Sequence, residues 1–431
     1  MKVIVIGNGV AGNTASSTIR RLDAQAEITI ISEEIYPEYS PCALPQYIAG
    51  ELSRPNVFLR NKRDYSRERT KTIFGQKVTG ISPEDRRVFL DTTSLTYDKL
   101  IIATGGKPVA LPIKGVNLDG VFNLKSLDDA DHIFHYAGNT AVIIGSGPVG
   151  VETSVALSKR GRQIYLIEVL DRVMPRVFDE TPSSRLRDIL EERGVRVLTG
   201  EKVISIVGNG KVEGVVTDQR RIKCDMVVLG AGMKPNIELA QQSGVNIGAL
   251  GGIAVTRQML TNLDNIYACG DCVEAEDRAS GEHTLSLLWH NARRQGEVAG
   301  YNCSGVTKSY LGSENITSLD IFGVHAVSFG SIEADGNRHQ DILVIDRSPG
   351  KNYYRLVIAQ GRLIGAQSIG DAQDMGALLC ALIRRDDLNQ IKQAIDQRTL
   401  PLNPLYYRVA RCLGPNIRRF EQKDKNSQDG R

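Results

Sequence analysis

One cysteine, Cys42, stands in the segment Tyr39-Ser-Pro-Cys-Ala-Leu-Pro45, where its position favours reactivity. The residues that follow, Ala43–Leu52, have a helical pattern, so we expect the thiol near a helix N-terminus. There the helix dipole favours the thiolate, which is the nucleophilic form of cysteine. The alternative is a buried cysteine with a structural role only, because free cysteine is among the most buried residue types.

Two stretches of the chain repeat one pattern of strand, glycine-rich turn, helix and strand. They are Val3–Ser32 and Ala141–Glu168, and each spans about the 30 residues that a nucleotide-binding βαβ unit needs. In such a unit the first glycine permits the turn, the second lets the backbone approach a pyrophosphate, and the third lets the helix pack on the strand. The helix N-terminus then offers N–H groups to the phosphates. The glycines are Gly7, Gly9 and Gly12 in the first unit and Gly145, Gly147 and Gly150 in the second.

An acidic residue about 20 positions after these glycines should hold a ribose hydroxyl. Glu33 meets this rule in the first unit, with Glu34 as its competitor, and Glu168 meets it in the second. Glu168 is followed by Val169 and Leu170, so no arginine stands beside it to bind a 2′-phosphate. The second unit is therefore predicted to bind NADH, with NADPH as the second choice. The alternative is that both glycine-rich segments are ordinary turns of an α/β protein and bind no ligand.

Further strands and a change of pattern indicate the fold class. Three apolar strands stop at small residues; they are Leu100–Gly106, Met226–Gly232 and Ile266–Asp271. From about Ser313 the pattern changes to alternating strands, Ser318–Phe329 and Tyr353–Ala359, followed by a helical stretch at Asp374–Ile395. We predict an α/β protein with two Rossmann-like dinucleotide-binding domains and a C-terminal α+β domain.

The composition is that of an ordinary globular protein. With 431 residues the chain is too long for one core and suits two or three domains. A net charge of +3 gives no sign of a polyanion-binding surface. Seven scattered cysteines argue against a secreted disulfide framework, and no apolar run is long enough to span a membrane. We expect a cytoplasmic protein that binds neither nucleic acid nor membrane.

Three further motifs add a family resemblance that covers nearly the whole chain. They resemble segments of the pyridine nucleotide–disulfide oxidoreductases, which are flavoproteins with two dinucleotide-binding domains. The motifs are Ala103-Thr-Gly105, Tyr267-Ala-Cys-Gly-Asp-Cys272 and Gly230-Ala-Gly-Met-Lys-Pro-Asn236. The resemblance implies that Thr104, Gly105 and Asp271 bind FAD and that Gly232 lies at the nicotinamide nucleotide.

The same resemblance implies how the domains are arranged along the chain. The first fold binds FAD, an inserted second fold binds NAD(P)H, and the chain then returns to complete the FAD domain. The implied FAD-binding parts are residues 1–110 and 251–312, on either side of an NAD(P)H-binding domain at 111–250. Residues 313–431 would form the interface domain of a homodimer, with a disordered tail.

The Cys42 segment resembles the single-cysteine branch of this family, where the motif reads roughly Ser-x-x-Cys-Gly-Leu-Pro. That branch includes coenzyme A–disulfide reductases, NADH oxidases and NADH peroxidases. This chain has Ala43 for the usual glycine and Gln46 for the usual tyrosine. The C-terminal third, notably Gly361–Asp371, resembles instead the NADH-dependent rubredoxin reductases and the flavin modules of nitrite reductases. The two resemblances agree on cofactors and differ on the electron acceptor.

The position of Tyr47 limits what Cys42 can do. Dithiol enzymes of the superfamily carry a second cysteine five residues on, and here that position is Tyr47. A redox-active Cys42 would therefore pass through a mixed disulfide, a sulfenic acid or a persulfide. The predicted function is an FAD-dependent NAD(P)H oxidoreductase that reduces a disulfide, persulfide, peroxide or oxygen through Cys42. The alternatives are a reductase of a small rubredoxin- or ferredoxin-like protein, in which Cys42 has no role, and a non-catalytic redox sensor.

Three other groups of residues are weaker candidates. Cys269 and Cys272 have CxxC spacing, but a zinc site would need a second pair, and no metal site is predicted. His290 begins a segment that resembles the helix beside the flavin; it could act as an acid there, or cap the helix or lie at the surface. Tyr406 and Tyr407 could reach the thiol of a partner subunit or fill the core of their own domain.

Overall fold

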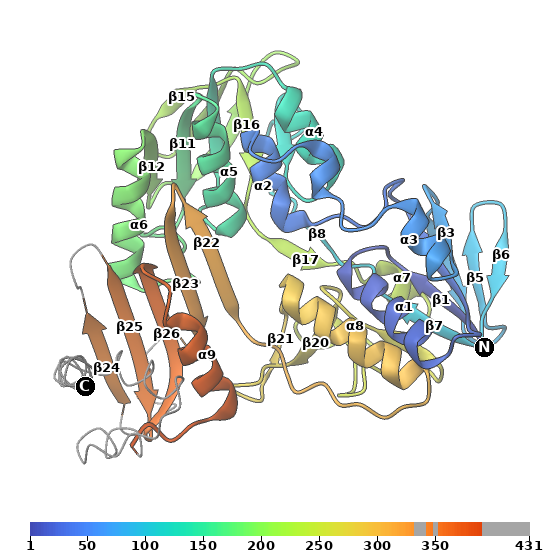
Figure 1. The fold of residues 1–431 in the computed structure, drawn as a ribbon. Coiled ribbons are helices and arrows are strands. Elements are labelled where there is room, and N and C mark those ends of the chain that lie inside the picture. The colour runs from blue at the N-terminus through green and yellow to red at the C-terminus, as the bar shows by residue number, and fades with distance from the viewer. Residues whose placement is uncertain (332–341, 348–351, 390–431) are drawn as a thin grey trace, which may run out of the picture. The chain divides into compact units, whose positions relative to one another are not determined.

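A computed structural model of the chain describes residues 1–331, 342–347 and 352–389, with the backbone alone for 342–347 (Figure 1). Its residues group into two compact units. The first comprises Met1–Gly145, Ala156–Tyr165 and Val203–Asn315, and the second comprises Ser146–Val155, Leu166–Lys202 and Ile316–Arg431. The four domain boundaries expected from the sequence stay a prediction.

A parallel five-stranded sheet forms the centre of the first unit. Its order is β19-β7-β1-β2-β3, which is the strand order of a Rossmann fold. The strands are β1 (Lys2–Ile6), β2 (Glu27–Ser32), β3 (Thr70–Phe74), β7 (Lys99–Ile102) and β19 (Ile266–Ala268). Their apolar residues are buried in one core, because a parallel sheet is covered on both faces.

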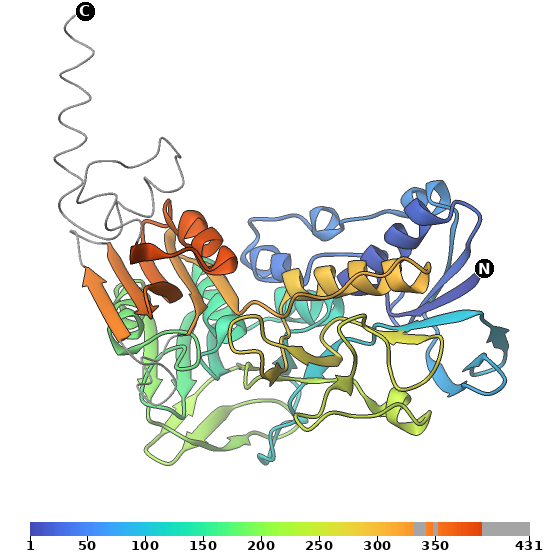
Figure 2. The same ribbon diagram turned by 90° about the horizontal axis from the view of Figure 1, so that it is seen from below.

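Two helices of the first unit, α1 (Val10–Leu22) and α8 (Trp289–Cys303), lie side by side (Figures 1 and 2). Glycines on α8 permit this close approach: a Cβ at Gly296 would lie 2.2 Å from the carbonyl oxygen of Ala11. This unit also contains the helices α2 (Leu44–Ala49), α3 (Lys62–Arg67), α4 (Leu127–His135) and α7 (Glu238–Gln242). Of these, α3 packs on β3, and α2 packs on α4.

A second five-stranded sheet has the order β12-β11-β10-β16-β9. Its strands are β9 (Val121–Asn123), β10 (Thr140–Ile144), β11 (Gln163–Glu168), β12 (Val195–Thr199) and β16 (Met226–Leu229). The helices that follow β10 and β11 are α5 (Pro148–Lys159) and α6 (Glu180–Glu192). The repeated βαβ pattern of the sequence is thus confirmed, and with it the α/β fold class.

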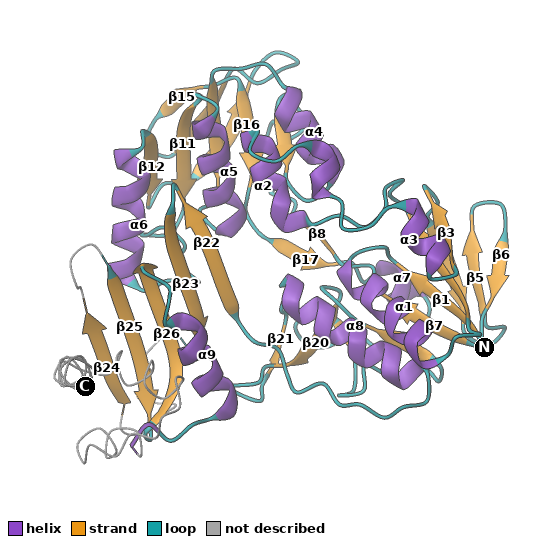
Figure 3. Cartoon of the chain, viewed as in Figure 1, coloured by secondary structure: helices purple, strands orange, loops and turns teal. Residues whose placement is uncertain are grey.

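The third sheet is antiparallel, with the order β22-β23-β26-β25-β24, and helix α9 (Met375–Arg384) packs on it (Figure 3). Its strands are β22 (Ile316–Ile321), β23 (Val324–Gly330), β24 (Ile342–Arg347), β25 (Tyr353–Ala359) and β26 (Arg362–Gly370). The single strand expected at Ser318–Phe329 is wrong. Phe322 and Gly323, with φ of 53° and 84°, form a two-residue hairpin turn that divides it into β22 and β23.

The helix expected at Asp374–Ile395 is shorter than predicted in its described part. It ends at Arg384, because Arg385 adopts a left-handed conformation with φ of 57°. Residues beyond 389 lie outside the described part of the chain, and so does the predicted tail. In the described residues no helix combines the length and apolar character needed to cross a membrane.

Short strands complete the described chain in four small sheets. They are β4 (Val78–Ser82), β5 (Arg87–Leu90) and β6 (Ser94–Thr96); β13 (Val203–Val207), β14 (Gly214–Thr217) and β15 (Arg221–Lys223); β8 (Gly106–Pro108) and β17 (Met233–Pro235); and β18 (Ile253–Ala254), β20 (Val273–Glu276) and β21 (His283–Thr284).

Candidate functional site

A cavity of about 700 Å³ lies in the first unit at the carboxyl ends of β1 and β7, where an open α/β sheet binds ligands. Five of the residues predicted to bind FAD line it, although they come from three separate stretches of the chain. They are Gly7, Gly9, Glu33, Thr104 and Gly105. The volume lies in the range of small-molecule and cofactor sites.

The glycines of the first turn have the geometry that a nucleotide requires. Gly7 has φ of +117°, and a Cβ there would lie 2.1 Å from the carbonyl oxygen of Ala103. A Cβ at Gly12 would lie 2.1 Å from the carbonyl oxygen of Gly7, so α1 packs directly on the turn. At Gly9, by contrast, a Cβ would meet nothing within 4 Å. Gly9 is also the N-cap of α1 and makes no side-chain cap, which leaves N–H groups for an anion.

Glu33 and Glu34 both line the cavity just after β2. The Glu33 side chain is 72% exposed, and its carboxylate lies 3.8 Å from Lys77 Nζ. Glu34 Oε2 instead accepts a hydrogen bond of 2.8 Å from the Tyr39 hydroxyl. Among the described residues, no donor lies within hydrogen-bonding distance of the Glu33 carboxylate, whereas Glu34 already has one donor in Tyr39.

The turn Ala103-Thr-Gly105 is fastened to a segment 132 positions later. Thr104 Oγ1 donates to the carbonyl oxygen of Asn236 at 2.7 Å, and Asn236 Nδ2 donates back to the carbonyl of Thr104 at 3.0 Å. The Asn236 N–H also donates to the carbonyl of Gly105 at 2.9 Å. Asn236 therefore forms part of the wall of this cavity, whereas the resemblance seen in the sequence placed its segment beside the nicotinamide nucleotide.

Asp271 lies just after β19, and no described residue donates a hydrogen bond to its carboxylate. Burial raises the pKa of Asp271, and the positive charge of Lys125 opposes the shift. Lys125 itself lines the cavity. A desolvated carboxylate without a donor fits a hydroxyl-bearing ligand, such as the ribityl chain of FAD, better than an empty interior.

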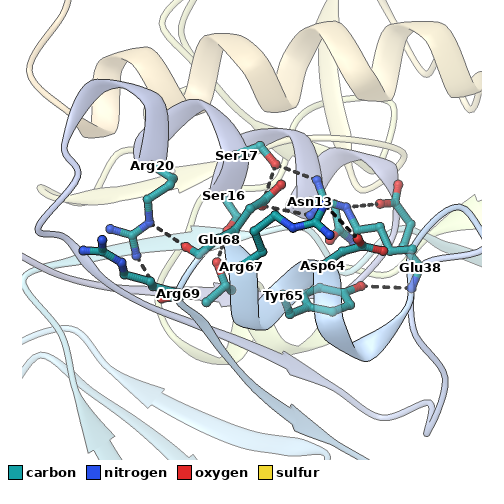
Figure 4. Close-up of polar contacts among 12 residues, drawn as sticks. Asn13, Ser16, Ser17, Arg20, Glu38, Asp64, Tyr65, Arg67, Glu68 and Arg69 are labelled. Carbon is teal, nitrogen blue, oxygen red and sulfur yellow. Dashed lines mark hydrogen bonds and ion pairs between the residues drawn. The ribbon is translucent and has the colours of Figure 1, made fainter.

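A polar network connects the first turn with the chain that leads into Cys42. Figure 4 shows its contact between Tyr65 and Glu38. The Tyr65 hydroxyl donates to Asn8 Oδ1 and accepts from the Glu38 N–H, both at 2.9 Å. Arg60 Nε donates to Glu38 Oε2 at 3.0 Å. Burial raises the pKa of Glu38 to about 7, although Arg60 opposes that shift. Asn8 lies inside the glycine-rich turn, so this network holds that turn in place.

Cys42 is exposed and lies in a 3₁₀ turn, Pro41–Ala43, that directly precedes α2. Its neighbour Pro41 lines the cavity. The helix expected at Ala43–Leu52 is therefore corrected: it spans Leu44–Ala49, because Gly50 with φ of 78° ends it. The residue Cys42 is exposed and not buried as the structural alternative expected, and its redox role stays a prediction.

Tyr47 anchors α2 to α4. Its ring stacks on Phe134 with centroids 4.9 Å apart, and its hydroxyl donates to Asp131 Oδ1 at 2.7 Å. Arg54 also binds Asp131, through Nε and Nη2. Burial and the Asp131 carboxylate raise the pKa of Tyr47 to about 12. Burial would raise the pKa of Asp131, but the hydrogen bonds from Arg54 and Tyr47 hold it below its ordinary value. These contacts fix the helix that follows Cys42.

In the second unit, Glu168 ends β11 and is only 8% exposed. Its Oε2 accepts from both the N–H and the hydroxyl of Ser146, at 2.8 and 2.7 Å. Its Oε1 accepts from the Leu170 N–H at 3.0 Å. Gly150 is buried, and a Cβ at Gly147 would meet nothing within 4 Å. The acid and the second glycine-rich turn are thus joined directly, which the sequence did not indicate.

Two predicted nicotinamide-site glycines belong to the first unit. Gly145 has φ of +100°, and a Cβ there would lie 2.6 Å from the carbonyl oxygen of Gly230. Gly232 has φ of +110° with open space where a Cβ would stand. Both positions require glycine for their backbone conformation.

The structure favours structural roles for the weaker candidates that lie in its described residues. Cys269 and Cys272 are fully buried, and burial raises the pKa of both thiols. His290 Nε2 lies 2.8 Å from the carbonyl oxygen of Glu314, which favours the structural role over the catalytic one. No group of three metal-binding side chains occurs in the described residues. Tyr406 and Tyr407 lie outside them.

Sequence reasoning missed several residues of these sites. Asn8, Tyr39, Lys77 and Lys125 line the cavity, and Ser146 binds Glu168. A further one is Glu152 on α5, two residues after Gly150, where burial raises the pKa of the carboxyl to about 7. Only the proximity of Asn8, Ser146 and Glu152 to the glycines could have signalled them.

Comparisons with known proteins agree with this geometry. Two family models match: "Pyridine nucleotide-disulphide oxidoreductase" over residues 1–296, and "Rubredoxin NAD+ reductase C-terminal domain" over 316–386. An NADH oxidase of Methanocaldococcus jannaschii is 32% identical over 416 residues, which cover 89% of this chain and 92% of that protein. An NAD(P)H coenzyme A polysulfide/persulfide reductase of Pyrococcus horikoshii is 32% identical over 319 residues, 70% of each chain.

A solved structure supports the same assignment. The NAD-dependent persulfide reductase from A. fulgidus has a TM-score of 0.87 and 29% sequence identity, and the match covers 100% of this chain and 84% of that one. The first family model alone spans well over half of the chain. On this evidence the chain belongs to the pyridine nucleotide–disulphide oxidoreductase family.

Proposed function

We propose that this protein is an FAD-dependent NAD(P)H oxidoreductase that passes electrons to a sulfur or oxygen acceptor through Cys42. One observation carries the proposal: exposed Cys42 follows Pro41, and Pro41 lines the cavity formed by the first glycine-rich turn. The thiol is thus at the edge of a site with the features of a dinucleotide cradle. Bound there, FAD would accept two electrons from NADH and release them to the acceptor.

Different residues around the cavity would bind different parts of FAD. The open space at Gly9 and the uncapped start of α1 suit the pyrophosphate. Exposed Glu33 suits the adenosine ribose, and Asp271, which lacks a protein donor, suits hydroxyls of the ribityl chain. Thr104 and Gly105 form the wall that Asn236 fastens. Lys125 lines the cavity and influences the carboxylate of Asp271, so a positive charge lies in the cavity wall near this acid.

For the nicotinamide nucleotide we propose the second glycine-rich turn, with Gly145, Gly147, Gly150, Gly232 and Glu168. The carboxylate of Glu168 would accept a ribose hydroxyl, which favours NADH over NADPH because a 2′-phosphate would meet its negative charge.

Cys42 would act by nucleophilic attack or by oxidation of its own sulfur. With a disulfide, the thiolate attacks one sulfur, the other leaves as a thiol, and two electrons from NADH break the mixed disulfide. With a peroxide, the thiolate attacks one oxygen and the O–O bond breaks; the other oxygen leaves, with a proton, as water or an alcohol, and the cysteine becomes a sulfenic acid. Two electrons from NADH and two protons would then return the sulfenic acid to thiol and water. Relatives named NADH oxidase and persulfide reductase support both acceptor classes.

Replacing Cys42 by Ser tests this function. We expect C42S to bind FAD and to be bleached by NADH, but to lose turnover with coenzyme A disulfide, polysulfide and peroxide. The matched control is Cys380→Ser, because Cys380 is the other exposed cysteine of the described residues. Unchanged turnover of C42S with every acceptor would overturn the role of Cys42.

A second candidate function is reduction of a small iron–sulfur protein, which the rubredoxin reductase C-terminal match over 316–386 favours. C42S would then keep full activity towards rubredoxin or ferredoxin. A redox sensor, the third reading, would show no bleaching of its flavin by NADH in the absence of air. The homodimer and the cytoplasmic location expected from the sequence belong to this proposal as well.

A further inference from the structure

Ser146 stands between the first two glycines of the second turn and is fully buried. Its N–H and its hydroxyl both donate to Glu168 Oε2, at 2.8 and 2.7 Å. Hydrogen bonds to a charged group are the stronger ones in proteins, so this pair holds the carboxylate firmly. The Leu170 N–H holds the other oxygen, Oε1, at 3.0 Å.

These contacts leave little of the Glu168 carboxylate for a ligand. An ionised carboxylate has about four acceptor positions on its two oxygens. Ser146 takes two of them on Oε2, and Leu170 takes one on Oε1. A single acceptor position therefore remains, on Oε1, and its direction is set by the donors already in place. The Glu168 carboxylate can therefore accept a hydrogen bond from one hydroxyl group, in one orientation.

The same hydroxyl also fixes the chain after β11. The Met174 N–H donates to Ser146 Oγ at 3.1 Å. Met174 is fully buried and has φ of 50°, a backbone conformation that needs support from its surroundings. Ser146 Oγ thus donates to the acid and accepts from the loop that follows it.

We infer that Ser146 is a positioning residue that sets the preference for NAD(H) over NADP(H), by holding Glu168 as a fixed acceptor for the 2′-hydroxyl. The inference rests on the proposed nicotinamide site. NADP(H) carries a phosphate on that oxygen and has no 2′-hydroxyl to donate, so its binding gains nothing from the held acceptor. Loss of the Ser146 hydroxyl therefore weakens NAD(H) binding and leaves NADP(H) binding nearly unchanged.

The test is the variant Ser146→Ala in the FAD-loaded protein, with dissociation constants for NAD⁺ and NADP⁺ measured by calorimetry. Binding of the oxidised nucleotides avoids flavin turnover. We expect the constant for NAD⁺ to rise about tenfold, the effect of one hydrogen bond to a charged group, and that for NADP⁺ to stay within about twofold. The preference for NAD⁺ over NADP⁺ then falls by roughly the same factor of ten.

Ser154→Ala is the matched control. Ser154 is also a fully buried serine and lies on α5, the helix that follows the turn of Ser146; its hydroxyl donates to the carbonyl oxygen of Gly150 at 2.8 Å instead of to Glu168. It should keep the wild-type ratio of the two constants. If S146A weakens both nucleotides equally, or leaves the ratio unchanged, the inference is overturned while the proposed function stands.

A further outcome distinguishes failure of this inference from failure of the proposed function. If the wild-type protein binds neither nucleotide, the proposed function itself fails. Should S146A not accumulate as folded protein, Ser146→Cys keeps a side chain with a weak donor, and its preference for NAD⁺ over NADP⁺ should fall below the wild-type value by less than about tenfold. A wild-type preference in S146C would then overturn the role of Ser146.

Discussion

The acid after the first glycine-rich turn and the acid after the second lie in opposite environments. Glu33 is 72% exposed at the edge of a cavity and has only Lys77 nearby, at 3.8 Å. Glu168 is 8% exposed and holds three hydrogen bonds from Ser146 and Leu170. A carboxylate that is already hydrogen-bonded by its own protein offers a ligand one acceptor position in a fixed direction. An exposed carboxylate has no such direction until a ligand orders its side chain. Two equal sequence motifs thus place their acids in different surroundings, and we expect a different ligand selectivity at each.

The first glycines of the two turns, by contrast, behave alike. Gly7 and Gly145 both have positive φ, and at both a Cβ would collide with a carbonyl oxygen of a neighbouring strand end. The second glycines, Gly9 and Gly147, both face open space. The backbone of the motif is therefore conserved between the two turns, and the difference lies in the side chains around it.

The largest effect should come from Gly7→Ala. The new Cβ would lie 2.1 Å from the carbonyl oxygen of Ala103 at a φ of +117°, so we expect a loss of about 3 kcal/mol or more in the free energy of unfolding. Denaturant unfolding and FAD content would measure it. Gly50→Ala is the control, because Gly50 has φ of +78° but open space, and it should lose only about 1 kcal/mol. Equal losses in both variants would show that the clash with Ala103 does not matter.

Glu168→Gln and Glu33→Gln should separate the two acids. An amide at Glu168 cannot accept from Ser146 on one side and Leu170 on the other, so we expect a loss of about 1–3 kcal/mol in stability and weaker NAD⁺ binding. Glu33→Gln should change stability by less than about 0.5 kcal/mol and weaken FAD alone. Thermal unfolding of the FAD-free proteins and ligand titrations decide this; a larger stability loss for Glu33→Gln would reverse the comparison.

Gly9→Ala and Gly147→Ala should test the likeness of the second glycines. Because nothing lies within 4 Å of either Cβ, we expect both variants to unfold within about 0.5 kcal/mol of wild type. The methyl group would instead occupy space meant for a pyrophosphate, so Gly9→Ala should lose FAD affinity and Gly147→Ala should lose NAD⁺ affinity. Full affinity in either variant would place the pyrophosphate elsewhere.

The last prediction concerns pH. Burial raises the pKa of Glu152 on α5 from 4.5 to about 7 in the folded protein. Since the folded value exceeds the unfolded one, its contribution to stability is present below about pH 4.5 and is lost as the pH rises to about 7. Glu152→Gln should flatten the fall in Tm over this range. Glu192→Gln, at an exposed position of α6, should keep the wild-type slope; a flat wild-type curve would contradict the shift.

Local patterns in the sequence predicted local structure well. The apolar runs, the glycine spacing and the acids after β2 and β11 all depend on neighbours within about 30 residues, and the structure confirms each βαβ unit. The errors also have local causes. Gly50 ends α2 earlier than predicted. The turn at Phe322–Gly323 was not predicted, because it lies inside an apolar run and phenylalanine is rarely found with positive φ.

The sequence by itself determined the two nucleotide folds, the single cysteine before α2 and the absence of its dithiol partner. Only the tertiary structure decided that Thr104 meets Asn236, that Tyr65 supports Asn8, and that Ser146 holds Glu168. These pairs are 132, 57 and 22 positions apart, so no local periodicity records them. They arise because parallel strands bring their carboxyl ends to one edge of a sheet, where side chains distant in sequence become neighbours.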